Sequence, residues 1–240
     1  VHYDPVTASL AGVFKDRMWM DWHVFTDYAT TKDGFVDAIR AHEPMIVAFR
    51  VTAQTREIVR FLAEVVAEQP EQVPVLFYGP LVSTHPEEAA TLSSMAILLT
   101  GEPEVGALNL LDGWKPGEPP TVPPPPGVWL SYFGDVLRSE DAGPANLKKI
   151  AKPDLVVFGG DRMFRRGIGA SMFAELKVLP FLTGHGTPSG NPANSNLVNF
   201  GYFTTYPPRL LDLDTIVFRL RALGPRVDHI EIWDREFGCD

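Results

Sequence analysis

The chain has 240 residues, of which 45% are hydrophobic, and its mean hydropathy is close to zero. This is typical of a soluble globular protein with one large or two modest domains, and no apolar run reaches the roughly 18 residues that a membrane helix needs. The net charge of −9 and the lack of Lys/Arg blocks argue against nucleic-acid binding. The single cysteine, Cys239, excludes internal disulfides and a cysteine-ligated cluster made by this chain alone, and favours a cytoplasmic location.

Helix and strand patterns alternate along the first half of the chain. Apolar residues with helical spacing, or a proline followed by acidic residues, predict four helices: 7–17, 32–41, 55–68 and 86–92. Aromatic-rich or continuous apolar runs predict four strands: 18–26, 45–49, 73–77 and 95–99. This alternation predicts a parallel sheet with helices on both faces. Ligands bind such sheets beyond the carboxyl ends of the strands, here at residues 50–55, 79–84 and 101–104.

The second half follows a Pro-rich segment, residues 112–127, which favours extended polyproline II and predicts a spacer. We therefore place a first domain at residues 1–115, a linker at 116–127 and a second domain at 128–240. Apolar patterns in the second domain predict strands and one helix: 154–158, 178–182, 208–223 (the helix) and 229–237.

Two loops of the first half have specific sequences. The strand at 73–77 runs into Y-G-P-L-V-S-T-H-P-E-E from Tyr78, and the strand at 95–99 runs into T-G-E-P-E from Thr100. They resemble the G-G-P-H-x-T-x-x-P-E-E and G-E-G-E runs of the cobalamin-binding domain that precedes radical SAM barrels. That domain is a flavodoxin-like sheet. The resemblance implies that both loops, with the loop at residues 50–55 facing the corrin, bind cobalamin.

The cofactor-binding residues implied by the resemblance lie in these three loops: Arg50, Val51, Thr52, Gln54, Tyr78, Gly79, Pro80, Val82, Ser83, Thr84, Gly101 and Glu102. Gly79 would let the backbone approach the nucleotide tail, and Ser83 and Thr84 would offer hydroxyls to its polar groups. Arg50 could face the corrin or be a surface arginine at a strand end. A further run, D-W-H from Asp21, resembles the D-x-H-x-x-G motif that supplies a cobalt-ligating histidine elsewhere, with Thr26 in place of the glycine.

The loop after residues 178–182 carries a second resemblance. It reads G-T-P-S-G-N-P-A-N from Gly186, against G-C-P-x-G-C-P-x-C in cobalamin-binding radical SAM proteins. Thr187, Asn191 and Asn194 stand at the three cysteine positions. Thiolates hold iron–sulfur clusters because sulfur is soft and anionic, and neutral oxygen donors cannot replace them. The resemblance therefore implies a degenerate loop without an iron–sulfur cluster, whose polar residues could bind a substrate or SAM carboxylate or cap turns.

Several other side chains have the chemistry of functional groups. His185, just before this loop, could contact a ligand or bond to backbone. Asp234 and Glu236 lie on one side of a predicted strand and could form an acid/base pair or serve a structural role. No nucleophile elbow, Walker loop or zinc-ligand spacing is present, so we assign no catalytic residue and no metal ligand.

These observations predict an α/β protein: a flavodoxin-like (Rossmann-like) parallel sheet followed by a partial radical SAM-type (β/α) barrel segment. The resemblance implies a cobalamin-binding protein related to B12-dependent radical SAM enzymes, in which cobalamin carries any chemistry, such as methyl transfer or sensing. Two alternatives stay open. One is a methyltransferase that uses cobalamin and SAM without its own cluster. The other is a non-catalytic regulatory subunit that binds an intact radical SAM partner.

Overall fold

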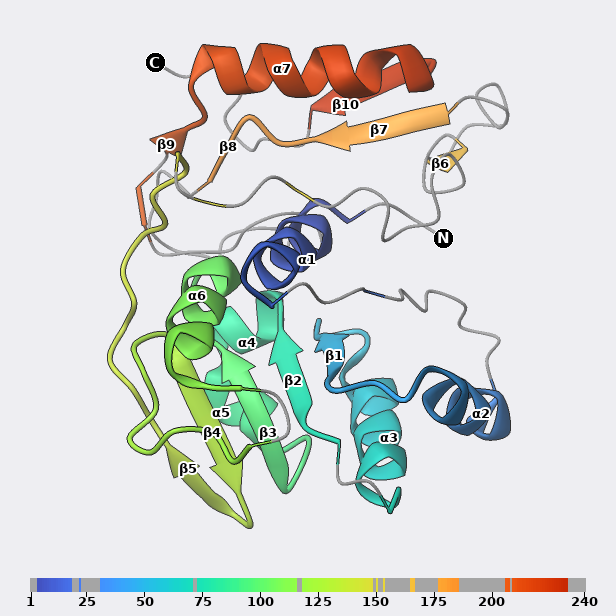
Figure 1. Cartoon of the computed structure of the whole chain (residues 1–240), viewed down its shortest axis with the longest axis vertical. Helices are drawn as coiled ribbons and strands as arrows, with labels where there is room; N and C mark the ends of the chain where they lie inside the picture. Colours follow the sequence, from blue (N-terminus) through green and yellow to red (C-terminus); the bar gives the residue numbers. More distant parts are fainter. Residues whose placement is uncertain are drawn as a thin grey trace. The chain divides into compact units, whose positions relative to one another are not determined.

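A computed structural model of the chain describes residues 4–18, 22, 31–70, 73–115, 118–148, 150, 153, 165–166, 177–185, 206–207 and 209–232. The chain divides into two compact units. One unit consists of residues 28–144, and the other combines residues 1–27 with residues 145–240. Each unit has a sheet of its own (Figure 1).

The sheet of residues 28–144 has five strands in the order β1-β2-β3-β4-β5. Their bounds are Val47–Arg50, Val75–Tyr78, Met95–Leu99, Val128–Tyr132 and Asp135–Leu137. β1, β2 and β3 are parallel, and β4 and β5 add an antiparallel hairpin beside β3. The unit is thus a mixed α/β fold compatible with a Rossmann-like domain. The three parallel strands are the ones that the apolar runs predicted at 45–49, 73–77 and 95–99.

The described residues of this unit form five helices: α2 (Lys32–His42), α3 (Arg56–Ala67), α4 (Pro80–Thr84), α5 (Pro86–Ala90) and α6 (Pro103–Gly113). The first four contribute to one core against the face of the sheet that carries Phe77 and Leu98. Phe49 links this core to α2, with ring centroids 6.3 Å from Phe35 and 6.1 Å from Phe77. α6 lies against Leu99, whose side chain points to the opposite face, so helices cover both faces (Figure 1).

Two helices were missed by the sequence reading. α4 and α6 begin inside the segments expected to be loops, and each has proline at its first helical position. Proline is favoured there because its fixed φ suits the helix and its missing N–H leaves no bond unmade. Pro80 and Pro103 therefore indicated in the sequence where α4 and α6 begin. α2 was predicted, and Thr31 caps it by accepting a hydrogen bond from the Gly34 N–H at 3.2 Å.

The Pro-rich segment is packed within this unit and does not separate two domains. Residues 118–127, which we call the strap, run beside α6. The Thr121 hydroxyl donates to the Gly113 carbonyl at 3.0 Å, and the Asn109 amide donates to the Pro126 carbonyl at 2.9 Å. The strap leads into β4, which pairs with β3. The predicted boundaries at 115 and 128 therefore differ from the structure, which divides the chain at residue 144 and groups residues 1–27 with the second unit.

The other unit contains α1 (Pro5–Met18), β6 (Arg165–Arg166), β7 (Lys177–Phe181), β8 (Gly184–His185), β9 (Arg209–Leu210), α7 (Leu213–Leu223), the 3-10 turn Gly224–Arg226 and β10 (His229–Ile232). β7, α7 and β10 form a parallel βαβ unit, with Val178 opposite His229. β6 flanks β7 on its other side. The order strand, helix, strand is as predicted, but α7 begins at Leu213 rather than at 208, because residues 209–210 form β9, and the strand predicted at 229–237 is described only as far as Ile232. The wider barrel stays a prediction.

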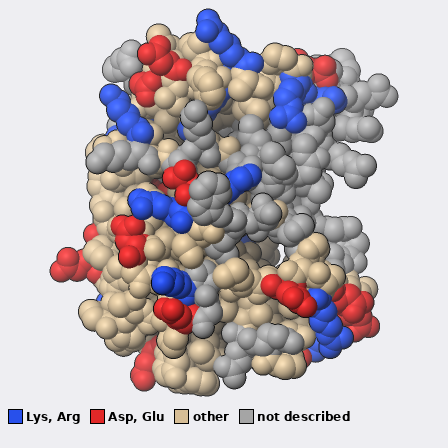
Figure 2. Space-filling view, in the orientation of Figure 1, with Lys and Arg blue, Asp and Glu red and all other residues tan. Residues whose placement is uncertain are grey.

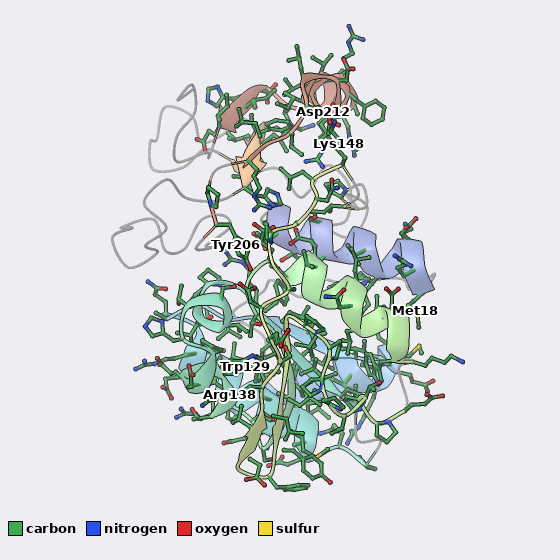
Figure 3. All side chains as sticks on the ribbon, turned by 90° about the vertical axis from the view of Figure 1, so that its left-hand side faces the viewer. Met18, Trp129, Arg138, Lys148, Tyr206 and Asp212 are labelled. Carbon is green, nitrogen blue, oxygen red and sulfur yellow. The ribbon has the colours of Figure 1, made fainter. Side chains whose placement is uncertain are left out.

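α7 begins with a well-formed cap. The Asp212 carboxylate accepts hydrogen bonds from the Thr215 backbone N–H and hydroxyl, both at 2.8 Å. These bonds, the backbone one first, lower the pKa of Asp212 below its ordinary value, with a smaller contribution from Lys148 beside it (Figure 3). At its other end α7 contributes Leu223 to a hydrophobic core that also contains Ala8 and Leu179.

The surface of the described residues carries no single-sign field on the face in view, because acidic and basic side chains alternate there (Figure 2). None of the described helices combines the length and apolar composition needed to traverse a bilayer. The strand predicted at 154–158 and most of the one at 18–26 lie outside the described residues.

Candidate functional site

The carboxyl ends of β1, β2 and β3 lead into three connections along one edge of the sheet, which we call the first, second and third loops, and the second loop contains the short helix α4. We call this edge the carboxyl edge, formed by residues 51–55, 79–85 and 100–104. All the cofactor residues implied by the resemblance lie in these loops or at the last residue of the strand before them. The parallel register of the three strands brings these loops together.

Backbone contacts join the first loop to the second. The Val51 N–H donates to the Tyr78 carbonyl at 2.7 Å, and the Leu81 N–H donates to the Val51 carbonyl at 3.1 Å. Gly79 lies against them with φ of 108° and ψ of −172°, a conformation open only to glycine. A Cβ there would lie 3.0 Å from the Val51 oxygen. The sequence led us to expect that Gly79 lets a ligand approach the backbone. In the structure the group that lies close to Gly79 is the backbone of Val51.

A side-chain bond joins the second loop to the third. The Ser83 hydroxyl donates to the Gly101 carbonyl at 2.6 Å. The residue before Gly101 is held from the other side, because the Thr100 N–H donates to the Gly127 carbonyl of the strap at 2.9 Å. The third loop is therefore fixed between Ser83 and the strap. Asn109 and Gly127, which the sequence reading did not single out, take part in this support.

The hydroxyl protons of Ser83 and Thr84 are bonded to backbone carbonyls of the chain. Ser83 gives its only proton to Gly101, and Thr84 gives its proton to the Pro80 carbonyl at 2.8 Å. The Nδ1 atom of His85 lies 2.8 Å from the Thr84 oxygen, so it must carry the hydrogen and donate. Ser83 and Thr84 were expected to offer hydroxyls to a ligand. In the structure both hydroxyl protons are bonded to backbone carbonyls, and the two oxygens keep lone pairs.

Burial separates residues that shape the edge from those that can reach a ligand. Tyr78, Pro80 and Val82 are buried, as are Val51, Thr52 and Glu102. Gln54 is exposed, and Arg50, Ser83, Thr84 and Gly101 are partly exposed. This second group can contact a bound molecule directly, whereas the buried group positions the loops.

A second buried acid lies close to Glu102. Glu102 is 1% exposed and Glu104 is 0% exposed, at the start of α6. Carboxylates are favoured at this end of a helix because the backbone N–H groups carry partial positive charge. Glu104 was not among the predicted site residues, although an acidic residue directly after a first-turn proline is a recognisable signal.

Several predicted residues of the other unit lie outside the described part of the chain: Asp21, His23, Thr187, Asn191, Asn194, Asp234 and Glu236. His185 is described and is buried in β8, opposite Arg209 of β9. The Arg209 guanidinium donates to the Ala145 carbonyl at 2.7 Å and lies 5.7 Å from the centre of the Tyr206 ring, which is labelled in Figure 3. Because Thr187, Asn191 and Asn194 lie outside the described residues, the degenerate cluster loop stays a prediction.

Comparisons with known proteins give matches among solved structures. No protein-family model and no curated protein matches the chain. Solved structures of the cobalamin-dependent S-adenosylmethionine radical enzyme OxsB do match. The selenomethionine-labelled apo form gives a TM-score of 0.67 at 16% identity, and covers 100% of this chain and 32% of OxsB. The forms with aqua-cobalamin, and with aqua-cobalamin and S-adenosylmethionine, give 0.70 and 0.71 at 15% identity, with 99% and 32% covered.

These matches extend over nearly the whole of this chain but only about a third of OxsB. At such low identity a structural likeness is evidence of fold and not of activity. The chain therefore has the fold of a part of a cobalamin-dependent radical enzyme.

Proposed function

We propose that the carboxyl edge of residues 28–144 binds cobalamin. The observation that carries this proposal is the joining of the three loops at the ends of β1, β2 and β3 by Val51, Leu81 and Ser83 into one continuous edge. The resemblance of the second and third loops to cobalamin-binding loops supports it. So does the likeness of fold to OxsB structures that contain aqua-cobalamin.

The residues present fit such a cofactor chemically. A corrin ring is bordered by carboxamide side chains, which need hydrogen-bond acceptors as partners. The partly exposed hydroxyl oxygens of Ser83 and Thr84 have lone pairs to give, since their protons are already used. Arg50 and Gln54 can meet amide carbonyl groups. Bound cobalamin would supply the chemistry itself, such as methyl transfer or sensing.

Within this proposal Ser83 has a positioning role. Its bond to Gly101 fixes the distance between the second and third loops, so its loss would let the third loop drift from the ligand. A hydrogen bond of this kind contributes about 1 kcal/mol, which corresponds to roughly fivefold in a dissociation constant. The test is a titration of the purified chain with aqua-cobalamin, followed by corrin absorbance and co-elution on gel filtration.

A matched pair of serine variants makes the titration specific. The single hydroxyl proton of Ser131 is likewise bonded to backbone, shared between the carbonyls of Ala90 at 3.0 Å and Ser93 at 2.9 Å, but Ser131 lies opposite Ala96 near the other end of β3. We expect Ser83→Ala to weaken cobalamin binding about fivefold and Ser131→Ala to leave it unchanged, although each removes one such bond. Failure of the wild-type chain to retain cobalamin would refute the proposal, and equal loss in both variants would refute the assignment of the edge.

A further inference from the structure

We infer that the carboxyl edge discriminates among corrinoids, binding those with neutral carboxamide side chains in preference to those with carboxylates. This inference rests on the proposed function and adds the chemical class that the edge selects. It follows from the direction of the hydrogen bonds at the edge. A carbonyl oxygen can only accept, so every hydroxyl bonded to one has spent its proton.

The second loop shows this direction at two neighbouring residues. Ser83 donates to Gly101 and Thr84 donates to Pro80, at 2.6 Å and 2.8 Å. Thr84 also accepts from His85, which fixes the hydrogen on Nδ1 and leaves the outer ring nitrogen, Nε2, as an acceptor in the neutral ring. Three neighbouring side chains of one loop therefore present lone pairs.

The first loop adds little donor capacity from its hydroxyls. The Thr52 and Thr55 oxygens are 3.1 Å apart, so one of their two protons lies between them. Each oxygen also accepts from the backbone N–H of the other residue, at 3.0 Å and 3.2 Å. The pair is thus occupied chiefly in closing its own turn.

Charge acts in the same direction. Arg50 is the cation among the predicted site residues and would attract a carboxylate. Against this, the chain as a whole carries a net charge of −9. A corrinoid carrying several carboxylates would bring oxygen against oxygen at the second loop and would be repelled by the net negative charge of the chain.

A carboxamide N–H can donate to the hydroxyl lone pairs, whereas a carboxylate has only acceptor atoms and leaves those lone pairs without a donor. An unmatched polar contact costs a factor of about ten in affinity at a partly solvated position. We therefore expect the amide-bearing and carboxylate-bearing corrinoids to differ by about that factor.

The experiment is a set of titrations of the whole chain at neutral pH with three corrinoids. Cobalamin has both the amides and the nucleotide tail, cobinamide keeps the amides without the tail, and cobyrinic acid has carboxylates in place of the amides. We expect cobinamide to bind about tenfold more tightly than cobyrinic acid. Cobyrinic acid binding as tightly as cobinamide would overturn the inference and leave the proposed function standing, whereas no binding of any corrinoid would refute both.

Two threonine variants test whether the edge is the source of the preference. Thr84→Val removes an acceptor from the edge, and Thr121→Val removes a hydroxyl that likewise donates to a backbone carbonyl, in the strap. We expect the cobinamide-to-cobyrinic acid ratio to fall about fivefold in Thr84→Val and to stay unchanged in Thr121→Val. A ratio that is the same in both variants would show that the preference arises elsewhere and overturn the assignment to this loop.

Discussion

The contact between α6 and the strap gives the sharpest prediction, the effect of Gly106→Ala. Alanine is the better helix former by about 1 kcal/mol, so a free surface would make this variant more stable. In the structure a Cβ at Gly106 would lie 2.6 Å from the Gly127 carbonyl oxygen, whereas ordinary contact begins at 3.4 Å. Overpacking of this kind costs about 1 to 3 kcal/mol.

Gly127 cannot move away from Gly106 without breaking its own hydrogen bonds. Its N–H donates to Glu140 at 2.8 Å, its carbonyl accepts from Thr100 at 2.9 Å, and a Cβ at its own position would lie 2.7 Å from the Ala142 Cβ. The cost should therefore be near the upper end, for a net destabilisation of about 2 kcal/mol. Gly113→Ala is the control in the same helix, since its nearest neighbour is the Thr121 hydroxyl at 3.8 Å.

The measurement is the midpoint of urea unfolding of the unit formed by residues 28–144, within the whole chain. Amide hydrogen exchange in β3 and β4 then reports on the same unit. We expect Gly106→Ala to lower the midpoint and Gly113→Ala to leave it unchanged or raise it slightly. If Gly106→Ala is as stable as the wild type, α6 and the strap do not approach as closely as described. The account of the Pro-rich segment as a packed strap would then be wrong.

Three further predictions concern single positions. Gly79→Ala should destabilise the chain more than Gly134→Ala in urea titrations, because both have positive φ but Gly134 has nothing within 4 Å of a new Cβ; equal effects would contradict the close packing at Gly79. Phe133→Asn should raise the urea midpoint by the equivalent of about 0.5 to 1 kcal/mol, because Phe133 has φ of 48° in a two-residue turn that favours Asn-Gly and is 69% exposed; a lower midpoint would contradict this. The lowered pKa of Asp212 means that its stabilisation of α7 is present above the ordinary value of 3.8 and lost as pH falls through the folded value. Acid should therefore speed hydrogen exchange at Thr215, relative to the intrinsic rate at each pH, in the wild type but not in Asp212→Asn, which keeps the cap without titrating; the same response in both would contradict the assignment.

The parallel strands and the longer helices were predictable from sequence because each signal is local. The apolar runs at 45–49, 73–77 and 95–99 are short and continuous, which is typical of strands buried between helices, and α3 has Val59, Ala63 and Val66 at helical spacing. The carboxyl edge then follows from strand direction alone. These features required no knowledge of which segments meet.

The strap and the hairpin could not be predicted, because their signal is not local. A run of prolines favours an extended chain whether it crosses solvent or a helix, and only the contact of Gly127 with Gly106 decides between the two. Likewise β4 pairs with β3, although α6 and the strap lie between the two strands along the chain. The direction of the Ser83 hydroxyl also depends on a carbonyl in another loop.

The position of the boundary decides which segments of the chain support the candidate site. A first domain ending at residue 115 would leave β3 as an edge strand and would lose the Gly127 carbonyl that holds Thr100. The third loop would then be tied only through Ser83. Gly127, at the end of the strap, is therefore part of the site's framework, because its carbonyl makes the end of β3 a fixed point against which the other two loops are set.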